Sequence, residues 1–418
     1  MNKKRNKMPI IWAIVVLMLM LNGNVGATAS LTSSTPGDEY LIVALGDSIS
    51  AGYEPGMDEK SVPYGFVERL SEQGLFHGRT KSVNYGILGL TSTGLGNYVS
   101  AIKDGKQVTP NEIQQGLPDP RIAAFAAGTS TAKADLSNAD LITITIGGND
   151  IQKLLPDIKD MSSDQLTAQS TDILTNYALQ VRNVVDTLIE LNPEAQIVVA
   201  DQYQPFPKIA GAGTYVTLQN VAASFTAAVD EIAEQYTAQG KNVKAAHVAE
   251  AFVGREISLT HIYPETDIHP NQKGYEEIAK VISKVVWDSY TETAAKKGEA
   301  EISIVVKGVE LKTQYQPVLK NGQTFIAIKD ITDAIGGESR WNSKTQSATV
   351  TYEGRSVVIP MGSNKITSNG ETLTTASPAF LHKIGKESKT YVPLAILAQG
   401  LGLDVKYSGK TKTVFINL

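Results

Sequence analysis

Short apolar runs alternate with longer amphipathic segments over residues 38–292. The apolar runs, which predict buried strands, lie at 40–45, 83–85, 141–146, 196–200 and 243–247. Apolar positions recur with helical spacing between them, at 63–73, 164–191, 216–238 and 271–290. This order predicts an α/β fold, an open parallel sheet covered by helices on both faces. Such sheets bind ligands beyond the carboxyl ends of their strands.

Residues 101–137 interrupt this order, because they are weakly periodic and contain three prolines. A connection of this length is uncommon in a compact domain. Two interpretations stand side by side: an irregular surface insertion, and a lid over the binding site.

The pattern changes again near residue 296. A polar, small-residue stretch at 293–300 predicts a linker, and residues 301–418 alternate apolar and polar positions as strands do. Residues 324–345 match 390–411 at a constant offset of 66. Each copy predicts a strand, a short helix ended by glycine and a hairpin. We therefore expect a smaller α+β domain with two internal repeats.

The N-terminus has the three regions of a secretory signal peptide. Basic residues precede an apolar run from Met8 to Leu21, and small residues follow at 26–29. The run is shorter than the roughly 20 residues that span a bilayer. We expect residues 1–29 to be removed, leaving a secreted, extracellular protein with no transmembrane anchor.

The amino-acid composition excludes several kinds of site and partner. The chain has no cysteine and five histidines, none of them closely paired, so we expect no disulfide, no metal and no other cofactor. A cysteine-free exported chain is typical of a Gram-positive exterior. Residues 1–29 and 299–418 each carry a net charge of +4, which leaves −13 on residues 30–298 from the total of −5. An acidic body argues against nucleic acid as a partner, and the basic C-terminal part favours contact with anionic cell-wall polymers.

Four motifs fall where predicted strands end. Ser48 follows the first strand in Gly-Asp-Ser, Gly89 follows the second in a glycine-rich turn, Asn149 follows the third in Gly-Gly-Asn-Asp, and His269 precedes the last helix. A serine hydroxyl becomes a nucleophile when an imidazole takes its proton, and a further acceptor fixes the imidazole tautomer. Acyl transfer also creates an oxyanion that needs hydrogen-bond donors.

These residues can supply every part of an acyl-transfer site. Ser48 and His269 would form the reacting pair, and Asp267 or a backbone carbonyl would orient the imidazole. The N–H groups of Ser48 and Gly89 and the amide of Asn149 would form the oxyanion hole. Tyr53 and the aromatic stretch at 203–207 are candidates for lining an acyl or sugar pocket.

The four motifs resemble blocks I, II, III and V of the GDSL, or SGNH, hydrolases. The resemblance implies a flavodoxin-like three-layer α/β/α sandwich over residues 38–292, a Ser48 nucleophile, a His269 base, and an oxyanion hole from Ser48, Gly89 and Asn149. The family usually places its acid three residues before the histidine, where this chain has Thr266. Asp267, two residues before it, is our assignment, and Glu265 is the other nearby acid.

Residues 301–418 resemble the copper amine oxidase N-terminal-like domain. His382 is their only histidine, so the resemblance does not imply copper here, since copper sites use several imidazoles or thiolates.

The sequence therefore predicts a secreted serine esterase or lipase that hydrolyses carboxylic esters through an acyl-enzyme. Two ester substrates are open: acyl or lipid esters, and O-acetylated polysaccharide. The alternative is a non-catalytic cell-wall-binding protein that retains a degenerate hydrolase scaffold.

Overall fold

The computed structural model describes residues 39–58, 60–152, 161, 163–294 and 301–418. The predicted signal peptide and most of the predicted linker lie outside these residues. Contacts divide the chain into two compact units. The larger unit comprises Ser33–Gln314 with Gly402–Leu418, and the smaller unit includes Tyr315–Leu401. Among the described residues, no helix has both the length and the apolar character needed to cross a membrane.

A five-stranded parallel sheet forms the centre of the larger unit, in the order β2-β1-β3-β4-β5. Its strands are β1 (Tyr40–Gly46), β2 (Thr80–Gly86), β3 (Leu141–Thr145), β4 (Gln196–Ala200) and β5 (Val243–Ala246). All five coincide with the predicted runs or overlap them. The order reverses at β1, so the carboxyl end of β1 is where a binding site is expected.

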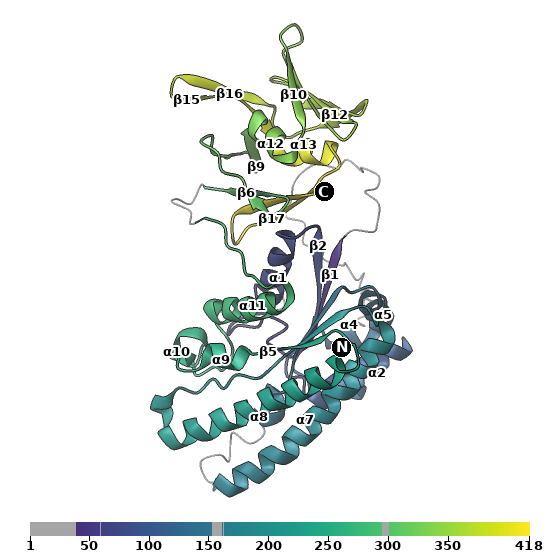
Figure 1. Cartoon of the computed structure of the whole chain (residues 1–418), viewed down its shortest axis with the longest axis vertical. Helices are drawn as coiled ribbons and strands as arrows, with labels where there is room; N and C mark the ends of the chain where they lie inside the picture. The colour runs from purple at the N-terminus through teal and green to yellow at the C-terminus, as the bar shows by residue number, and fades with distance from the viewer. Residues whose placement is uncertain (1–38, 59, 153–160, 162, 295–300) are drawn as a thin grey trace, which may run out of the picture. The chain divides into compact units, whose positions relative to one another are not determined.

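Helices cover both faces of this sheet (Figure 1). Successive residues of β1 point to opposite faces, so Val43 packs in one core and Ile42 in the other, both fully buried. The first core is covered by α2 (Ser92–Asp104), α5 (Thr129–Ser137), α7 (Ser163–Leu191) and α8 (Ala212–Thr237). The second is covered by α1 (Phe66–Leu75), α9 (Val248–Phe252), α10 (Glu256–Leu259) and α11 (Gln272–Trp287). The predicted three-layer α/β/α sandwich is confirmed.

The weakly periodic stretch 101–137 contains more helix than its pattern indicated. It includes the end of α2, then α3 (Pro110–Ile113), α4 (Ile122–Ala127) and α5. Ile113 and Leu136 are fully buried in the first core. The stretch is therefore packed into the sandwich at several points rather than lying on its surface as an irregular insertion.

A small second sheet also belongs to the larger unit. It has the order β17-β18-β6-β7, with β6 (Ser303–Val306), β7 (Val309–Glu310), β17 (Asp404–Ser408) and β18 (Thr413–Asn417). Phe415 packs edge-on against Phe76 after α1, with ring centroids 5.1 Å apart. The Asn417 amide donates to the carbonyls of Leu75 and Gly78 at 3.0 and 2.9 Å. The last strand of the chain is thus built into the unit that holds the sandwich.

The described part of the smaller unit is rich in strands and has two short helices, α12 (Ile328–Ile335) and α13 (Leu394–Gly400). One sheet has the order β15-β16-β9-β8 and the other β10-β11-β12-β13-β14. The strands are β8 (Val318–Lys320), β9 (Gln323–Ala327), β10 (Glu338–Asn342), β11 (Ser347–Tyr352), β12 (Arg355–Pro360), β13 (Lys365–Ser368), β14 (Glu371–Thr374), β15 (Phe380–Ile384) and β16 (Glu387–Pro393). The hairpins that follow α12 and α13 belong to different sheets, so the two predicted repeats are not placed equivalently.

Candidate active site

Ser48 lies on a sharp turn directly after β1. Gly46 has φ +138°, and a Cβ there would lie 2.1 Å from the Thr145 carbonyl oxygen, so only glycine fits. The N–H of Asp47 donates to that same carbonyl at 3.0 Å. The turn is therefore fixed to β3, and it places Ser48 at the carboxyl edge of the sheet as predicted.

His269 comes from the other end of the sequence and contacts Ser48. Its Nε2 lies 2.8 Å from Ser48 Oγ. The ring stands just before α11, where the Asn271 side chain caps the helix by accepting from the N–H groups of Lys273 and Gly274. This cap fixes the start of the helix and, with it, the chain that leads back to His269.

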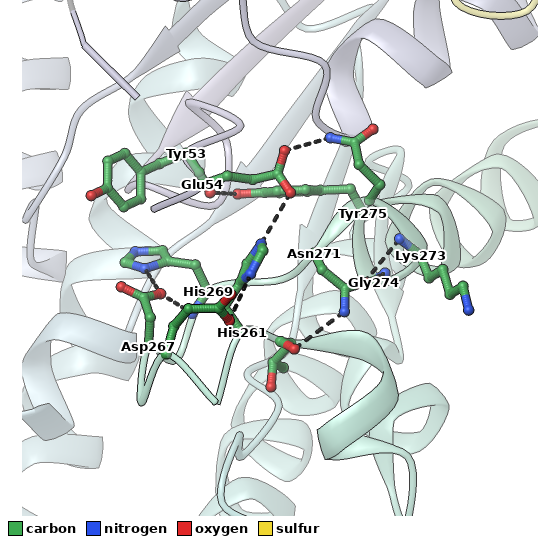
Figure 2. Close-up of polar contacts among 12 residues, drawn as sticks. Tyr53, Glu54, His261, Asp267, His269, Asn271, Lys273, Gly274 and Tyr275 are labelled. Atoms are coloured by element: carbon green, nitrogen blue, oxygen red, sulfur yellow. Dashed lines mark hydrogen bonds and ion pairs between the residues drawn. The ribbon is translucent and has the colours of Figure 1, made fainter. Parts of the chain in front are cut away.

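Asp267 accepts from His269 twice. Its Oδ1 is 2.7 Å from the ring Nδ1 and 2.8 Å from the backbone N–H of His269 (Figure 2). Since an ionised carboxylate only accepts, Nδ1 carries a proton and Nε2 of the neutral ring is left to accept from Ser48. Thr266, three residues before the histidine, has φ +57°. This left-handed residue, unusual for a β-branched side chain, makes the tight turn that brings Asp267 to the ring.

Three donors are available for an oxyanion. Within the described residues, the N–H groups of Ser48 and Gly89 have no acceptor. Gly89 has φ +79°, and a Cβ on it would lie 2.8 Å from Pro118, so the turn requires glycine. Gln114 holds this turn by donating to the Gly89 carbonyl and accepting from the N–H of Thr91, both at 2.9 Å.

Asn149 stands at the start of the short helix α6 (Gly148–Gln152). Its Nδ2 donates to the Leu90 carbonyl at 2.9 Å, which uses one of the two amide hydrogens. The remaining hydrogen is available for a ligand. This bond also ties the Asn149 side chain to the turn that carries Gly89.

Asp47, next to Ser48, is buried at 1% exposure. Its Oδ1 accepts from the N–H of Ile49 at 3.0 Å, as an aspartate in a turn commonly does. Burial raises the pKa of this carboxyl to about 7, because removal from water disfavours the charged form.

An apolar cavity of about 110 Å³ opens beside Ser48 and His269. The site's own residues Ser48, Asn149 and His269 form one wall. The rest is mainly apolar and comes from the segment after β4 and from α8, including Tyr203, Phe206, Leu218, Val221, Ala222 and Phe225. Tyr203 and Phe206 belong to the predicted aromatic stretch. The α8 residues were not predicted, because their spacing on a long helix looks the same as ordinary core packing.

Two other features were also missed. The ring of Tyr53, a predicted pocket residue, packs edge-on against His269 with centroids 4.7 Å apart and is not among the cavity's lining residues. His261 has a carboxylate on each side, Glu54 at 3.1 Å and Glu265 at 3.3 Å. The Tyr53–His269 and Glu54–His261 contacts could not be found from local sequence, since each joins residues that are distant in the chain.

Several known proteins are similar to part of this chain. The Bacillus subtilis (strain 168) protein YpmR is 26% identical over 254 residues, which cover 60% of this chain and 82% of YpmR. The phospholipase A1 of Streptomyces albidoflavus is 17% identical, with a TM-score of 0.40 over 60% of this chain and 99% of that one. A variant of Axe2, a Geobacillus acetyl-xylooligosaccharide esterase, is 19% identical, with a TM-score of 0.37 over 61% and 97%.

Two families match separate parts of the sequence. Residues 305–416 match the copper amine oxidase N-terminal domain, the second of the two predicted resemblances. Residues 44–277, more than half of the chain and the whole of the site described above, match the GDSL-like lipase/acylhydrolase family. This chain therefore belongs to the GDSL-like lipase/acylhydrolase family.

Proposed function

We propose that this protein is a carboxylic ester hydrolase that works through an acyl-enzyme on Ser48. The observation that carries the proposal is the continuous hydrogen-bonded chain Ser48–His269–Asp267, with distances of 2.8 and 2.7 Å. A hydroxyl, a neutral imidazole and a carboxylate in this order are the parts of a serine hydrolase triad. Membership of the family supports the same reaction class.

In this mechanism Ser48 Oγ attacks the ester carbonyl while His269 Nε2 takes its proton. Negative charge develops on the carbonyl oxygen and is stabilised by the N–H groups of Ser48 and Gly89 and the amide of Asn149. His269 then protonates the departing alcohol, which leaves the acyl group on Ser48. A water molecule, deprotonated by His269, releases the acid and restores the enzyme.

Between the two open substrate classes, the cavity favours acyl or lipid esters. An acetyl group needs room for one methyl, a volume comparable to the 10–15 Å³ that admits a single water-sized sphere. The cavity beside Ser48, at about 110 Å³, is several times larger and its walls are mainly apolar. Apolar surface is stabilised by burying acyl methylene groups, at about 0.8 kcal/mol for each one.

The test is hydrolysis of p-nitrophenyl acetate, butyrate, octanoate and palmitate by the wild type and by Ser48→Ala and His269→Ala. Both variants should lose turnover, while the control Ser100→Ala, at an exposed position of α2, should keep it. The best substrate should be longer than acetate. Turnover that survives in Ser48→Ala would remove the nucleophile assignment. A wild type inactive on every ester would favour the non-catalytic scaffold.

We further propose that the protein is exported and contacts the cell wall. The signal-peptide pattern of residues 1–29 supports export, and 14 basic against 10 acidic side chains over 299–418 support attraction to anionic wall polymers. Fractionation of cells that express the full chain tests export. Retention of the full protein on purified walls at low salt, lost at high salt, tests the contact.

A further inference from the structure

His261 and His269 face each other at the base of the loop that carries Asp267. The N–H of His261 donates to the His269 carbonyl at 2.9 Å, and the N–H of Asp267 donates to the His261 carbonyl at 3.1 Å. The neighbouring residues Thr260 and Pro270 form an isolated β-bridge. The backbone position of His269 therefore depends on that of His261.

The side chain of His261 reaches away from this loop to the segment that follows Ser48. Its Nε2 is 3.1 Å from Glu54 Oε1, a residue 207 positions earlier in the chain. Figure 2 shows this contact above the Asp267–His269 pair. The two side chains are 22% and 24% exposed, so the contact is shielded from water much more than an ordinary surface ion pair. Glu265, on the other side of the ring, is 49% exposed and is expected to matter less.

Glu54 is itself fixed at several points. Its Oε2 accepts from the Gln272 side chain at 2.6 Å, at the first residue of α11. The preceding residue, Tyr53, packs its ring against His269 and accepts at its carbonyl from the Tyr275 hydroxyl at 2.6 Å. The Glu54 carboxylate thus joins three elements: the segment after Ser48, the loop of His269 and the start of α11.

We propose that His261 and Glu54 form a positioning pair, which clamps the His269 loop against the Ser48 segment and keeps His269 Nε2 within reach of Ser48 Oγ. This inference rests on the proposed function and deepens it. Neither side chain lines the acyl cavity or contacts Ser48, so the pair acts through the backbone and through Tyr53. Catalysis is sensitive to small errors in such alignment, and a displacement of about 1 Å can cost about 100-fold in rate.

The expected signature is a fall in kcat with little change in KM, because the pair orients the reacting groups without contacting the acyl chain. For His261→Ala and for Glu54→Ala we expect kcat to fall about tenfold or more. The kcat of the double variant should be no lower than that of the less active single variant, since either change breaks the same contact. His261→Gln, which keeps a polar side chain able to donate to Glu54, should recover part of the loss.

A matched control is the histidine that follows β5, His247. His247 also lies between two carboxylates, Asp201 at 3.7 Å and Asp230 at 3.5 Å, but contacts none of the site residues through them. His247→Ala should leave kcat within about twofold, as for surface positions generally. Melting temperatures of all variants show whether each is folded at the assay temperature.

The second readout is the rate at which a small fluorophosphonate labels Ser48, which depends on the activated hydroxyl and not on acyl binding. Labelling should slow in His261→Ala and Glu54→Ala in proportion to kcat, and not in His247→Ala. If the wild type is not labelled, the proposed function fails. If the wild type is labelled and the folded His261→Ala and Glu54→Ala react equally fast, the positioning pair alone is overturned.

Discussion

Asp267 holds both the ring and the backbone of His269 through a single carboxylate oxygen, at 2.7 Å from Nδ1 and 2.8 Å from the backbone N–H. The double contact ties the tautomer of the imidazole to the shape of the loop. It also accounts for an acid two residues before the histidine: Thr266, with φ +57°, turns the chain so that the next residue reaches back to the ring.

Replacing this acid should therefore reduce turnover strongly. Asp267→Asn can present an N–H to the ring and favour the wrong tautomer, so we predict a loss of kcat of about 10³-fold or more. Glu265→Ala, at the other acid near the histidine, should cost less than about threefold, because its side chain is half exposed and, within the part of the chain that the structure describes, pairs with His261 alone. Steady-state kinetics on one p-nitrophenyl ester compare the two. Equal losses would show that the carboxylate of Asp267 has no special role.

The volume of the cavity should limit the length of the acyl chain that the protein accepts. Ala222 on α8 lines it and is 6% exposed, so Ala222→Phe places a ring where acyl methylene groups would lie. We predict a fall in kcat/KM of about tenfold or more for octanoate, from the loss of about 0.8 kcal/mol for each excluded methylene. The value for acetate should stay nearly constant.

The neighbouring Ala223 is exposed on the same helix, so Ala223→Phe is the matched control and should leave the ratio of octanoate to acetate hydrolysis unchanged. A parallel loss on both esters in Ala222→Phe would indicate a distorted site instead of a shortened cavity. Comparing the ratio of the two substrates removes differences in the amount of active protein.

Local sequence patterns were sufficient for the sandwich and for the residues at its strand ends. The strand β1 is recognisable because both of its faces are buried, which produces a continuous apolar run. Ser48, Gly89, Asn149 and His269 are recognisable because each stands in a turn at an end of an element. What the patterns could not supply was pairing across the chain, such as Glu54 with His261.

The boundaries between the compact units were harder to predict, because they too depend on contacts between residues that are distant in the chain. The last strands, β17 and β18, look like a hairpin of the C-terminal domain, and residues 305–416 do match one family. The contacts of β17 and β18 nevertheless group residues 402–418 with the unit that contains the sandwich. Phe415 and Phe76 are apolar residues that fit any core, and only the folded structure shows which core they share.

The buried Asp47 should make stability depend on pH. Its pKa is raised to about 7 in the folded protein from 3.8, because of burial. A group whose folded pKa is raised binds its proton more tightly in the native state, so the stabilisation is present below pH 3.8 and is lost as the pH rises through 7. Wild type should lose stability between about pH 4 and 7 relative to Asp47→Asn, which cannot ionise.

The measurement is urea unfolding of both proteins at pH 5, 6, 7 and 8. Between pH 5 and pH 8 the free energy of unfolding of the wild type should fall relative to that of Asp47→Asn by up to about 3 kcal/mol, because about two pKa units of the shift lie between pH 5 and the folded pKa of about 7. A difference that does not change with pH would show that Asp47 is ionised throughout this range. Unfolding is the appropriate readout because it reports the stability of the fold directly.

The contact between β18 and the end of α1 should make the C-terminal strand necessary for the stability of the unit that holds the proposed active site. Phe415 is 2% exposed and forms a buried cluster with Leu75 and Val305, against which Phe76 packs. Phe415→Ala should destabilise this unit by about 3–5 kcal/mol, the usual cost of a large buried side chain reduced to alanine. Tyr407→Ala, in the same sheet but 57% exposed, should cost less than about 0.5 kcal/mol. Loss of esterase activity during urea titration reports on the correct unit. If Phe415→Ala loses activity at the same urea concentration as the wild type, the strand is a passive attachment and the site is stable without it.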